Sequence, residues 1–366
     1  MQDQLNAIFK EVDDPRSYRN QKHPFISLIG VSLLGVISGI DSFSGFADYA
    51  EAHLEGLKRY FDFPNGAPSH DTFQRLWDTI DPVKFCNSFH EFTKTIQILT
   101  EGIISIDGKT IRNSGDNPLH IVSAWCTSND LVLAQEKVDS KSNEITAIPK
   151  LLDLLDLKSK LITIDAMGCQ RKICSQIAEQ GGDYLISLKG NQGTLHEDIK
   201  LWFTDKELIK QCSSWEENDK GHGRIEQRTA YVTDDINWLQ ERHKWPYLKS
   251  IGVVVSKVIK ANKETQEMRF YVSSMEASAE KLCKAARAHW GIENKLHWRL
   301  DVVFNEDGCC ITNDNAAENM DILRKWALNI LHKAKTKPSQ SIKSVQRKSA
   351  MSFTYLISVV NKIFHA

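Results

Sequence analysis

The 366-residue chain lacks the features that mark several classes of protein. Its 8 cysteines include no CxxC pair, so neither a zinc ribbon nor a disulfide framework is indicated, and reduced thiols in a cytoplasmic protein are expected. The apolar run 25–40 is shorter than the roughly 20 residues of a membrane helix, so it predicts a buried helix and no membrane partner. The polar segment 1–24 carries both signs of charge, and we expect no signal peptide.

The chain also has little excess charge of either sign. A net charge of −1 does not by itself indicate a nucleic-acid partner. The distribution is uneven, however, because residues 324–348 contain Lys and Arg but no Asp or Glu. This basic stretch could contact phosphates. The alternative is a solvated helix followed by a flexible basic tail.

The spacing of apolar residues predicts an α/β protein. Residues 1–95 have mostly helical periodicity, and from about residue 101 the pattern changes to short β-branched runs. These runs predict the strands 103–106, 121–126, 131–138, 161–164 and 184–188. Helical spacing occupies 143–157 and 170–180. Three strands in a meander, then helix, strand, helix and strand, is the order of a ribonuclease H-like mixed sheet.

Further strand-like runs lie between that sheet and the next helix, and they predict a β-rich insertion. The predicted domains are a helical N-terminal domain 1–95, a catalytic core formed by 96–192 and 276–335, the insertion 193–275, and a basic C-terminal segment 336–366.

Three acidic residues lie at positions suited to metal-dependent phosphodiester chemistry. Asp107 and Asp165 each follow a predicted strand, and Glu293 lies in a helix-like stretch. An acid just past an apolar strand lies at the carboxyl edge of the sheet, where open α/β sheets place their chemistry. Each acid also has a structural alternative, namely a turn opener for Asp107, a helix cap for Asp165 and a solvated helix residue for Glu293. Asp301 and Glu306 are rivals for the third position.

Three carboxylates without a thiolate fit a magnesium site. Mg²⁺ prefers carboxylate oxygens, and a pair of ions roughly 3.5 to 4 Å apart activates the nucleophile and stabilises the leaving oxygen. We expect Asp107 and Asp165 to bind one Mg²⁺ and Asp107 and Glu293 the other, with Mn²⁺ able to substitute.

A second set of residues could hold phosphate groups of DNA. Its members are Lys109, Lys189, Gln192, Arg287 and His289. Lys189 follows a predicted strand, and its alternative role is a solvated side chain in a tight turn.

Three polar side chains are predicted to lie on the same face of one helix. His289, Glu293 and His297 repeat every four residues on one face. A zinc site is conceivable, but without an HExxH pattern these histidines are expected to orient phosphate or a carboxylate. The expected packing residues of this helix are Trp290, Ile292, Leu296 and Leu300.

Over nearly its whole length the chain resembles the H-repeat-associated proteins, a group of bacterial insertion-sequence transposases with a DDE active site. The stretches that carry the resemblance are Gly66 to Phe73, Ile106 to Arg112, Asp165 to Gln170, Leu188 to Gln192 and His289 to Trp298. The resemblance implies cleavage of transposon-end DNA and joining of the freed 3′-hydroxyl to target DNA, with Asp107, Asp165 and Glu293 as the acids.

Three functions remain open at this point. The first is a transposase that binds transposon ends and target DNA, and that could form a homodimer when it pairs two ends. The second is a DNA-binding protein of the same fold that no longer transposes. The third is a stand-alone Mg²⁺-dependent nuclease. Inverted repeats in the flanking DNA would favour the first.

Overall fold

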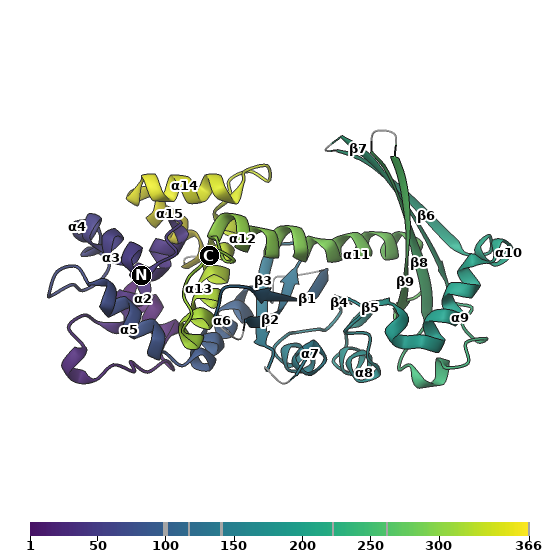
Figure 1. Ribbon diagram of the computed structural model, residues 1–366, viewed down its shortest axis with the longest axis horizontal. Helices are drawn as coiled ribbons and strands as arrows, with labels where there is room; N and C mark the ends of the chain where they lie inside the picture. The colour runs from purple at the N-terminus through teal and green to yellow at the C-terminus, as the bar shows by residue number, and fades with distance from the viewer. Residues whose placement is uncertain (98–101, 116–117, 140–141, 222, 261–262, 365–366) are drawn as a thin grey trace.

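Helices occupy both ends of the computed structural model, and one mixed sheet runs through its middle (Figure 1). The structure describes residues 1–97, 102–115, 118–139, 142–221, 223–260 and 263–364. The helices before the sheet are α1 (Gln2–Ile8), α2 (Phe25–Ile37), α3 (Phe43–Ala52), α4 (Leu54–Leu57), α5 (His70–Thr79) and α6 (Pro82–Gln97). Those within or after it are α7 (Glu144–Asp153), α8 (Arg171–Glu179), α9 (Gly193–Thr204), α10 (Lys206–Ile209), α11 (Ala279–Gly291), the π-helical η4 (Ile292–His297), α12 (Trp298–Phe304), α13 (Asp314–Ala334), α14 (Ile342–Met351) and α15 (Phe353–Phe364).

The strands form a 9-stranded sheet in the order β3-β2-β1-β4-β5-β9-β8-β7-β6. Their bounds are β1 (Ile103–Ile111), β2 (Leu119–Cys126), β3 (Leu131–Lys137), β4 (Leu161–Ile164), β5 (Asp183–Leu188), β6 (Ser213–Gly221), β7 (Arg224–Thr233), β8 (Ser250–Lys260) and β9 (Lys263–Ser273). The first three strands pair antiparallel, whereas β4 is parallel to β1 and β5 is parallel to β4. This is the ribonuclease H-like arrangement, so the predicted fold class is confirmed.

Helices cover both faces of the sheet, which explains why its central strands are apolar on both sides. On one face, apolar side chains of α7, α8 and α9 pack with Ile104, Ile106 and Ile186. On the other, Leu282 and Ala285 of α11 pack with Leu185. The long helix α11 crosses that second face towards the N-terminal helices (Figure 1).

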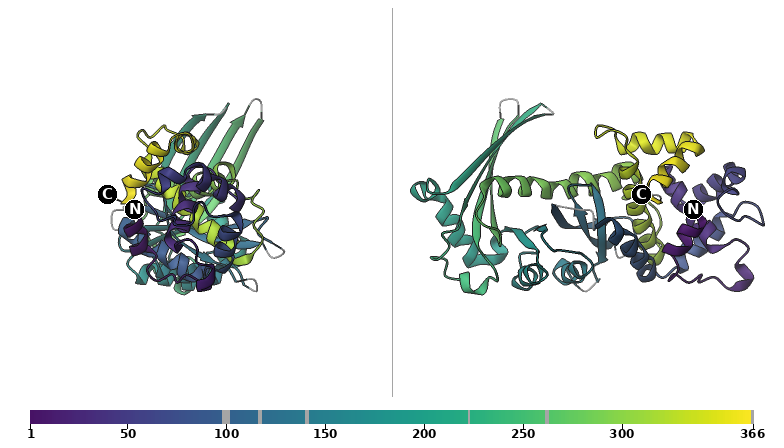
Figure 2. Two further views of the ribbon diagram at one scale, coloured as in Figure 1. Left: turned by 90° about the vertical axis from the view of Figure 1, so that its left-hand side faces the viewer. Right: turned by 180° about the vertical axis from the view of Figure 1, so that it is seen from behind.

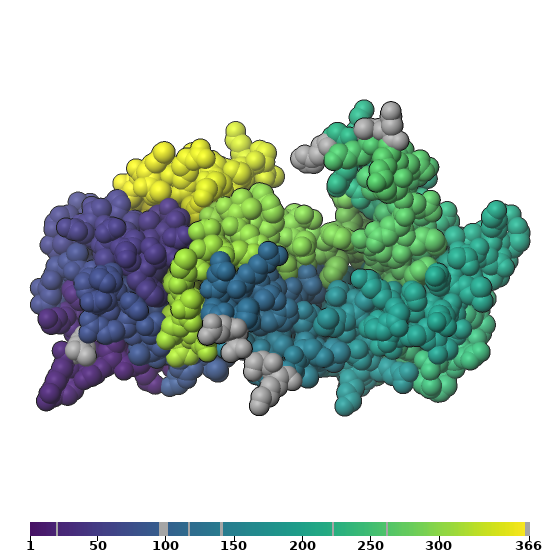
Figure 3. Space-filling model, viewed as in Figure 1, coloured from purple at the N-terminus to yellow at the C-terminus, as the bar shows by residue number. Residues whose placement is uncertain are grey.

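The β-rich segment 193–275 extends the same sheet, because β9 pairs antiparallel with β5. The edge strand β6 was not expected from the sequence. Nearly all of its residues are exposed, and an edge strand without apolar alternation leaves no periodic signal. The ends of β7 to β9 project from the body, and the surface is hollowed between them and α14 (Figure 3). The domain boundaries drawn from the sequence remain a proposal.

A second core lies at the other end of the molecule and is built around α13. Apolar residues from α1 to α6 pack there with α13 and with the C-terminal helices. Figure 2 shows the N-terminal helices and the C-terminal helices α14 and α15 together at this end of the structure. Arg324 and Lys325 of α13 are each 2 % exposed, so the expectation that they lie on a solvated helix or contact phosphates is wrong. The tail after α13 folds into α14 and α15.

The buried helix predicted at 25–40 is confirmed as α2, whose side chains from Ile26 to Ile37 are buried. Among the described residues, we find no helix with both the length and the apolar character that crossing a membrane requires.

Candidate metal centre and active site

Two of the predicted acids lie on adjacent parallel strands at the same edge of the sheet. The pairing of β1 with β4 ends at Ile106 and Ile164, and Asp107 and Asp165 are the next residues along the chain. Neighbouring strands lie about 4.8 Å apart, so these two acids are neighbours. β1 continues to Ile111 by pairing with β2, so the expectation that Asp107 ends its strand or opens a turn is wrong.

Asp165 does begin a turn. Its Oδ1 accepts hydrogen bonds from the backbone amides of Met167 at 3.0 Å and Gly168 at 3.3 Å. It does not cap α8, because Gln170 occupies the N-cap position. The turn therefore holds the Asp165 carboxylate in place at the end of β4 and fixes its direction.

Glu293 comes from the π-helical segment η4, which follows α11 and packs on β1. π-Helical turns are rare and occur frequently at functional sites. Ile292 and Leu296 are buried under the segment, as predicted, while Glu293 is 61 % exposed. His297, one helical turn further on, is 8 % exposed, and its Nδ1 lies 3.8 Å from Asp107 Oδ2 and 3.8 Å from Glu293 Oε2.

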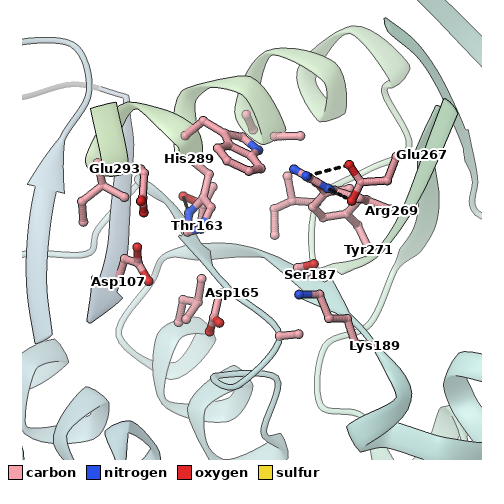
Figure 4. Close-up of a pocket in the computed structure, with 17 residues that line it drawn as sticks. Asp107, Thr163, Asp165, Ser187, Lys189, Glu267, Arg269, Tyr271, His289 and Glu293 are labelled. Atoms are coloured by element: carbon pink, nitrogen blue, oxygen red, sulfur yellow. Dashed lines mark hydrogen bonds and ion pairs between the residues drawn. The ribbon is translucent and has the colours of Figure 1, made fainter. Parts of the chain in front are cut away.

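All three predicted acids line one cavity of about 330 Å³. Figure 4 shows Glu293 and Asp107 facing one another across its mouth, with Asp165 beside them on the next strand. The remaining wall comes from β5, β9 and α11, including Lys189, Arg269 and His289. Segments separated by up to 186 residues (293 − 107) are thus brought together.

The electrostatics of the cavity disfavour three ionised carboxylates. Burial raises the pKa of Asp107 to about 7, and the nearby carboxylates of Asp165, Glu144 and Glu293 add to the rise. Burial likewise raises the pKa of Asp165, against hydrogen bonds from the backbone. The pKa of His297 falls to about 3, chiefly through burial. At neutral pH its imidazole is therefore uncharged and can act as a ligand.

The residues present fit a divalent cation. One ligand atom each from Asp107, Glu293 and His297 lie within 4.8 Å of one another, a spacing that atoms around one ion can adopt with small rotations. A cation here would also offset the carboxylate repulsion that adds to the effect of burial on the pKa of Asp107. Oxygen ligands favour Mg²⁺ or Mn²⁺, and an added imidazole shifts the preference towards transition metals.

The rival acids lie elsewhere. Lys109 Nζ contacts Asp301 Oδ1 at 2.6 Å, Glu306 Oε2 at 2.6 Å and Asp307 Oδ1 at 3.4 Å. None of these four residues is among the described residues that line the cavity. Lys109 is thus engaged by three carboxylates, which leaves it poorly placed to hold a phosphate.

The other expected phosphate contacts separate into two groups. Lys189 and His289 line the cavity, although His289 is half-buried and its Nδ1 lies 3.1 Å from Thr163 Oγ1. Gln192 donates from Nε2 to the carbonyl of Cys169 at 2.6 Å, and so ties its loop to the turn after Asp165. Arg287 faces β6, where its Nη2 lies 2.5 Å from Asp219 Oδ2.

Three residues of the site escaped prediction from the sequence. Trp290, expected to pack, is 46 % exposed and lines the cavity, with the Arg269 guanidinium 4.3 Å from its ring centroid. Arg269 belongs to β9, which no local pattern places beside α11. Glu144, at the start of α7, lies near Asp107 and Asp165, and its Oε1 lies 2.7 Å from His120 Nε2. In the sequence, Glu144 has no feature that distinguishes it from an ordinary acidic residue in the first turn of a helix.

Comparison with known proteins identifies the family. Residues 6–93 match the family model described as DDE_Tnp_1-associated, and residues 99–330 match the Transposase DDE domain. Two Escherichia coli K12 proteins, "H repeat-associated putative transposase YhhI" and "Putative protein YbfL", are each 42% identical over 361 residues, which is 95% of both chains compared. "Putative transposase YncI" of Escherichia coli O157:H7 is 39% identical over 360 residues, covering 95% of this chain and 92% of that protein. The chain belongs to the family of transposases with a DDE domain.

Proposed function

We propose that this chain cleaves DNA at transposon ends and joins the freed 3′-hydroxyl to target DNA, in the cytoplasm and with Mg²⁺ or Mn²⁺ bound. The observation that supports this most is the convergence of Asp107, Asp165 and Glu293 on one cavity. Membership of the family supports transposase activity in general, and the roles of the individual residues are our proposal.

Asp107, Asp165 and Glu293 would hold the metal, with His297 Nδ1 as a further candidate ligand. When bound, the metal supplies an activated water or hydroxyl and stabilises charge on the phosphoryl oxygens. The chain itself orients these side chains. The two strands fix the aspartates side by side, and Nδ1 of the buried His297 lies 3.8 Å from a carboxylate oxygen of Asp107 and 3.8 Å from one of Glu293.

Lys189 and Arg269 are the proposed contacts to the DNA strand being cut. Lys189 lies at the end of β5 and points into the cavity (Figure 4). Arg269 is held by Glu267 at 2.8 and 2.9 Å and lies over the ring of Trp290. Two cations beside the acids would neutralise phosphate oxygens and place the scissile bond near the carboxylates.

Cleavage of labelled DNA that contains the element's ends, with Mg²⁺, tests the proposal. Glu293→Gln should cut at least about 10²-fold more slowly than the parent, as expected when one preorganised electrostatic group is lost. The matched control is Glu280→Gln on the neighbouring helix α11, which removes an exposed pair with Lys284 and should cut like the parent.

Other outcomes would overturn the proposal in recognisable ways. Equal cutting by the parent and Glu293→Gln would remove the assigned site. Cutting without joined product would leave a stand-alone nuclease. Binding of the ends without cutting would leave a DNA-binding protein that no longer transposes.

A further inference from the structure

A second cavity, of about 460 Å³, lies among the N-terminal helices. We name it the basic cavity; it is bounded by residues 15–23, in the loop before α2, and by 67–79, which include α5. Asn65 Nδ2 donates to the carbonyl of Lys22 at 2.5 Å and fastens this loop near α5. In Figure 1 these segments lie at the end of the molecule opposite β6 to β9.

Arg16 is buried in the wall of the basic cavity with one nitrogen unused. Its side chain is 5 % exposed. Nε and Nη2 donate to the two carboxylate oxygens of Asp14 at 2.8 and 2.7 Å, and Nη2 also donates to the carbonyl of His23. The remaining Nη1 is buried and has no hydrogen-bond partner among the described residues.

His23 also lines the basic cavity and has a second unused nitrogen. The residue is 6 % exposed, and its Nδ1 is also buried without a partner in the described part of the chain. Buried polar groups in folded proteins are nearly always hydrogen-bonded, so an unpartnered one points to a missing ligand, water or ion. Two residues in the wall of one cavity thus each keep a buried polar nitrogen without a partner among the described residues.

The rest of the wall suits an anion. Ser69 and Thr72 contribute hydroxyl groups, which lie 3.2 Å from each other. Lys22 and Arg75 contribute exposed cations, and no Asp or Glu is among the described residues that line the cavity. Asp14 offsets the charge of Arg16 but not the charges of Lys22 and Arg75. A phosphate group has several oxygens, each of which can accept hydrogen bonds. A cavity wall with several donors and a net positive charge therefore suits it.

We infer that the basic cavity binds a phosphate group and, resting on the proposed function, that this phosphate belongs to the DNA backbone. Backbone contacts fix the register and orientation of a protein on a duplex without reading its sequence. The cavity lies outside the acid-lined site, so it would anchor DNA rather than take part in the reaction. The match between residues 6–93 and an associated family model assigns no ligand to this part of the chain.

Binding to duplex DNA at several salt concentrations tests the inference in the full-length protein. The test variant, Lys22→Ala combined with Arg75→Ala, changes exposed side chains only. It should weaken binding roughly tenfold on every sequence tried and lower the slope of log K against log salt by about 1 to 2, since each lost phosphate contact changes the slope by about 0.9. The control, Lys10→Ala combined with Arg59→Ala, removes two exposed cations outside the cavity and should bind as the parent does.

A second measurement separates the sources of the phosphate. Inorganic phosphate should raise the melting temperature of the parent and of the control more than that of the test variant. Inorganic phosphate could stabilise the parent more than the test variant while the two proteins show the same salt dependence of DNA binding. In that case the cavity binds a free anion and the DNA assignment is wrong. If neither measurement distinguishes the variants, the cavity is not an anion site. In either case, cutting by the parent and not by Glu293→Gln would leave the proposed function standing.

Discussion

At the scale of single residues, the proposed active site brings together groups whose burial costs stability. Asp107 is largely buried beside other carboxylates, and its pKa is raised to about 7. Sites of this kind are commonly less stable than they would be without their functional groups. His297 adds a buried ring to the same region, and its Nε2 has no hydrogen-bond partner among the residues that the structure describes. This loss of stability is expected if these groups are kept together to bind a metal ion.

Asp107→Asn should therefore stabilise the metal-free protein above neutral pH. An unfolded Asp ionises near pH 4, whereas folded Asp107 keeps its proton until about pH 7. Folding is thus coupled to proton uptake between these values, and the parent loses stability as pH rises from about 4 to about 7. At pH 8 the variant should be more stable by about 1–3 kcal/mol.

Thermal unfolding in EDTA between pH 5 and pH 8 measures this difference. The gap between the variant and the parent should widen as pH rises and level off above pH 7. Parallel melting profiles over that range would show that Asp107 does not carry the raised pKa.

At the scale of elements, α13 contains basic residues that the sequence suggested were exposed and that the structure buries. Its Lys325 forms an ion pair with Asp321 at 2.9 Å, and both side chains are nearly inaccessible. Asp321 also accepts a hydrogen bond from Gln135 at 2.7 Å. A cluster of basic residues in the sequence is thus divided between a buried structural network in α13 and the exposed surface of α14.

Lys325→Met should lower the free energy of unfolding by about 3–5 kcal/mol, because it leaves Asp321 buried without its partner. Arg347→Met on α14 removes an exposed cation and should change stability by less than about 0.5 kcal/mol. Urea unfolding of both variants provides the comparison. Similar small effects from the two substitutions would mean that the buried pair contributes little.

At the scale of the whole molecule, the two chain ends complete one core. Leu356, Val359 and Val360 of α15 are at most 1 % exposed and belong to the same cluster as Leu28 and Phe46. The N-terminal helices and the C-terminal segment are therefore physically one unit, arranged around α13. The basic cavity belongs to this unit, while the acid-lined cavity lies at the edge of the sheet, under α11 and η4.

Deleting residues 336–366 should destabilise this unit by roughly 5 kcal/mol or more, since each fully buried aliphatic side chain contributes about 1.5–3 kcal/mol. The measurement is thermal unfolding together with binding of a dye for exposed apolar surface. The control, Lys337→Ala with Arg347→Ala and Lys348→Ala, removes charge but keeps the helices and should melt like the parent. A truncated protein with parental stability would show that α14 and α15 are dispensable for the core.

The sequence by itself determined the elements whose signal is local. Short apolar and β-branched runs predicted β1 to β5, because strands buried on both faces of a sheet are apolar almost throughout. The order of strands and helices predicted the sheet. The same runs predicted that Asp107 and Asp165 are neighbours, and they are, because each follows the last residue pair of β1 and β4. That β1 continues past Asp107 by pairing with β2 was not predicted.

Only the tertiary structure decided the features that depend on contacts between distant segments. Lys109 appeared available for phosphate until the fold brought Asp301 and Glu306 to it, and Trp290 appeared to be a packing residue until β9 placed Arg269 over its ring. The unused nitrogens of Arg16 and His23 have no counterpart in any local pattern. Burial and charge pairing are set by the whole three-dimensional neighbourhood of a side chain, and the residues adjacent in sequence supply only a small part of it.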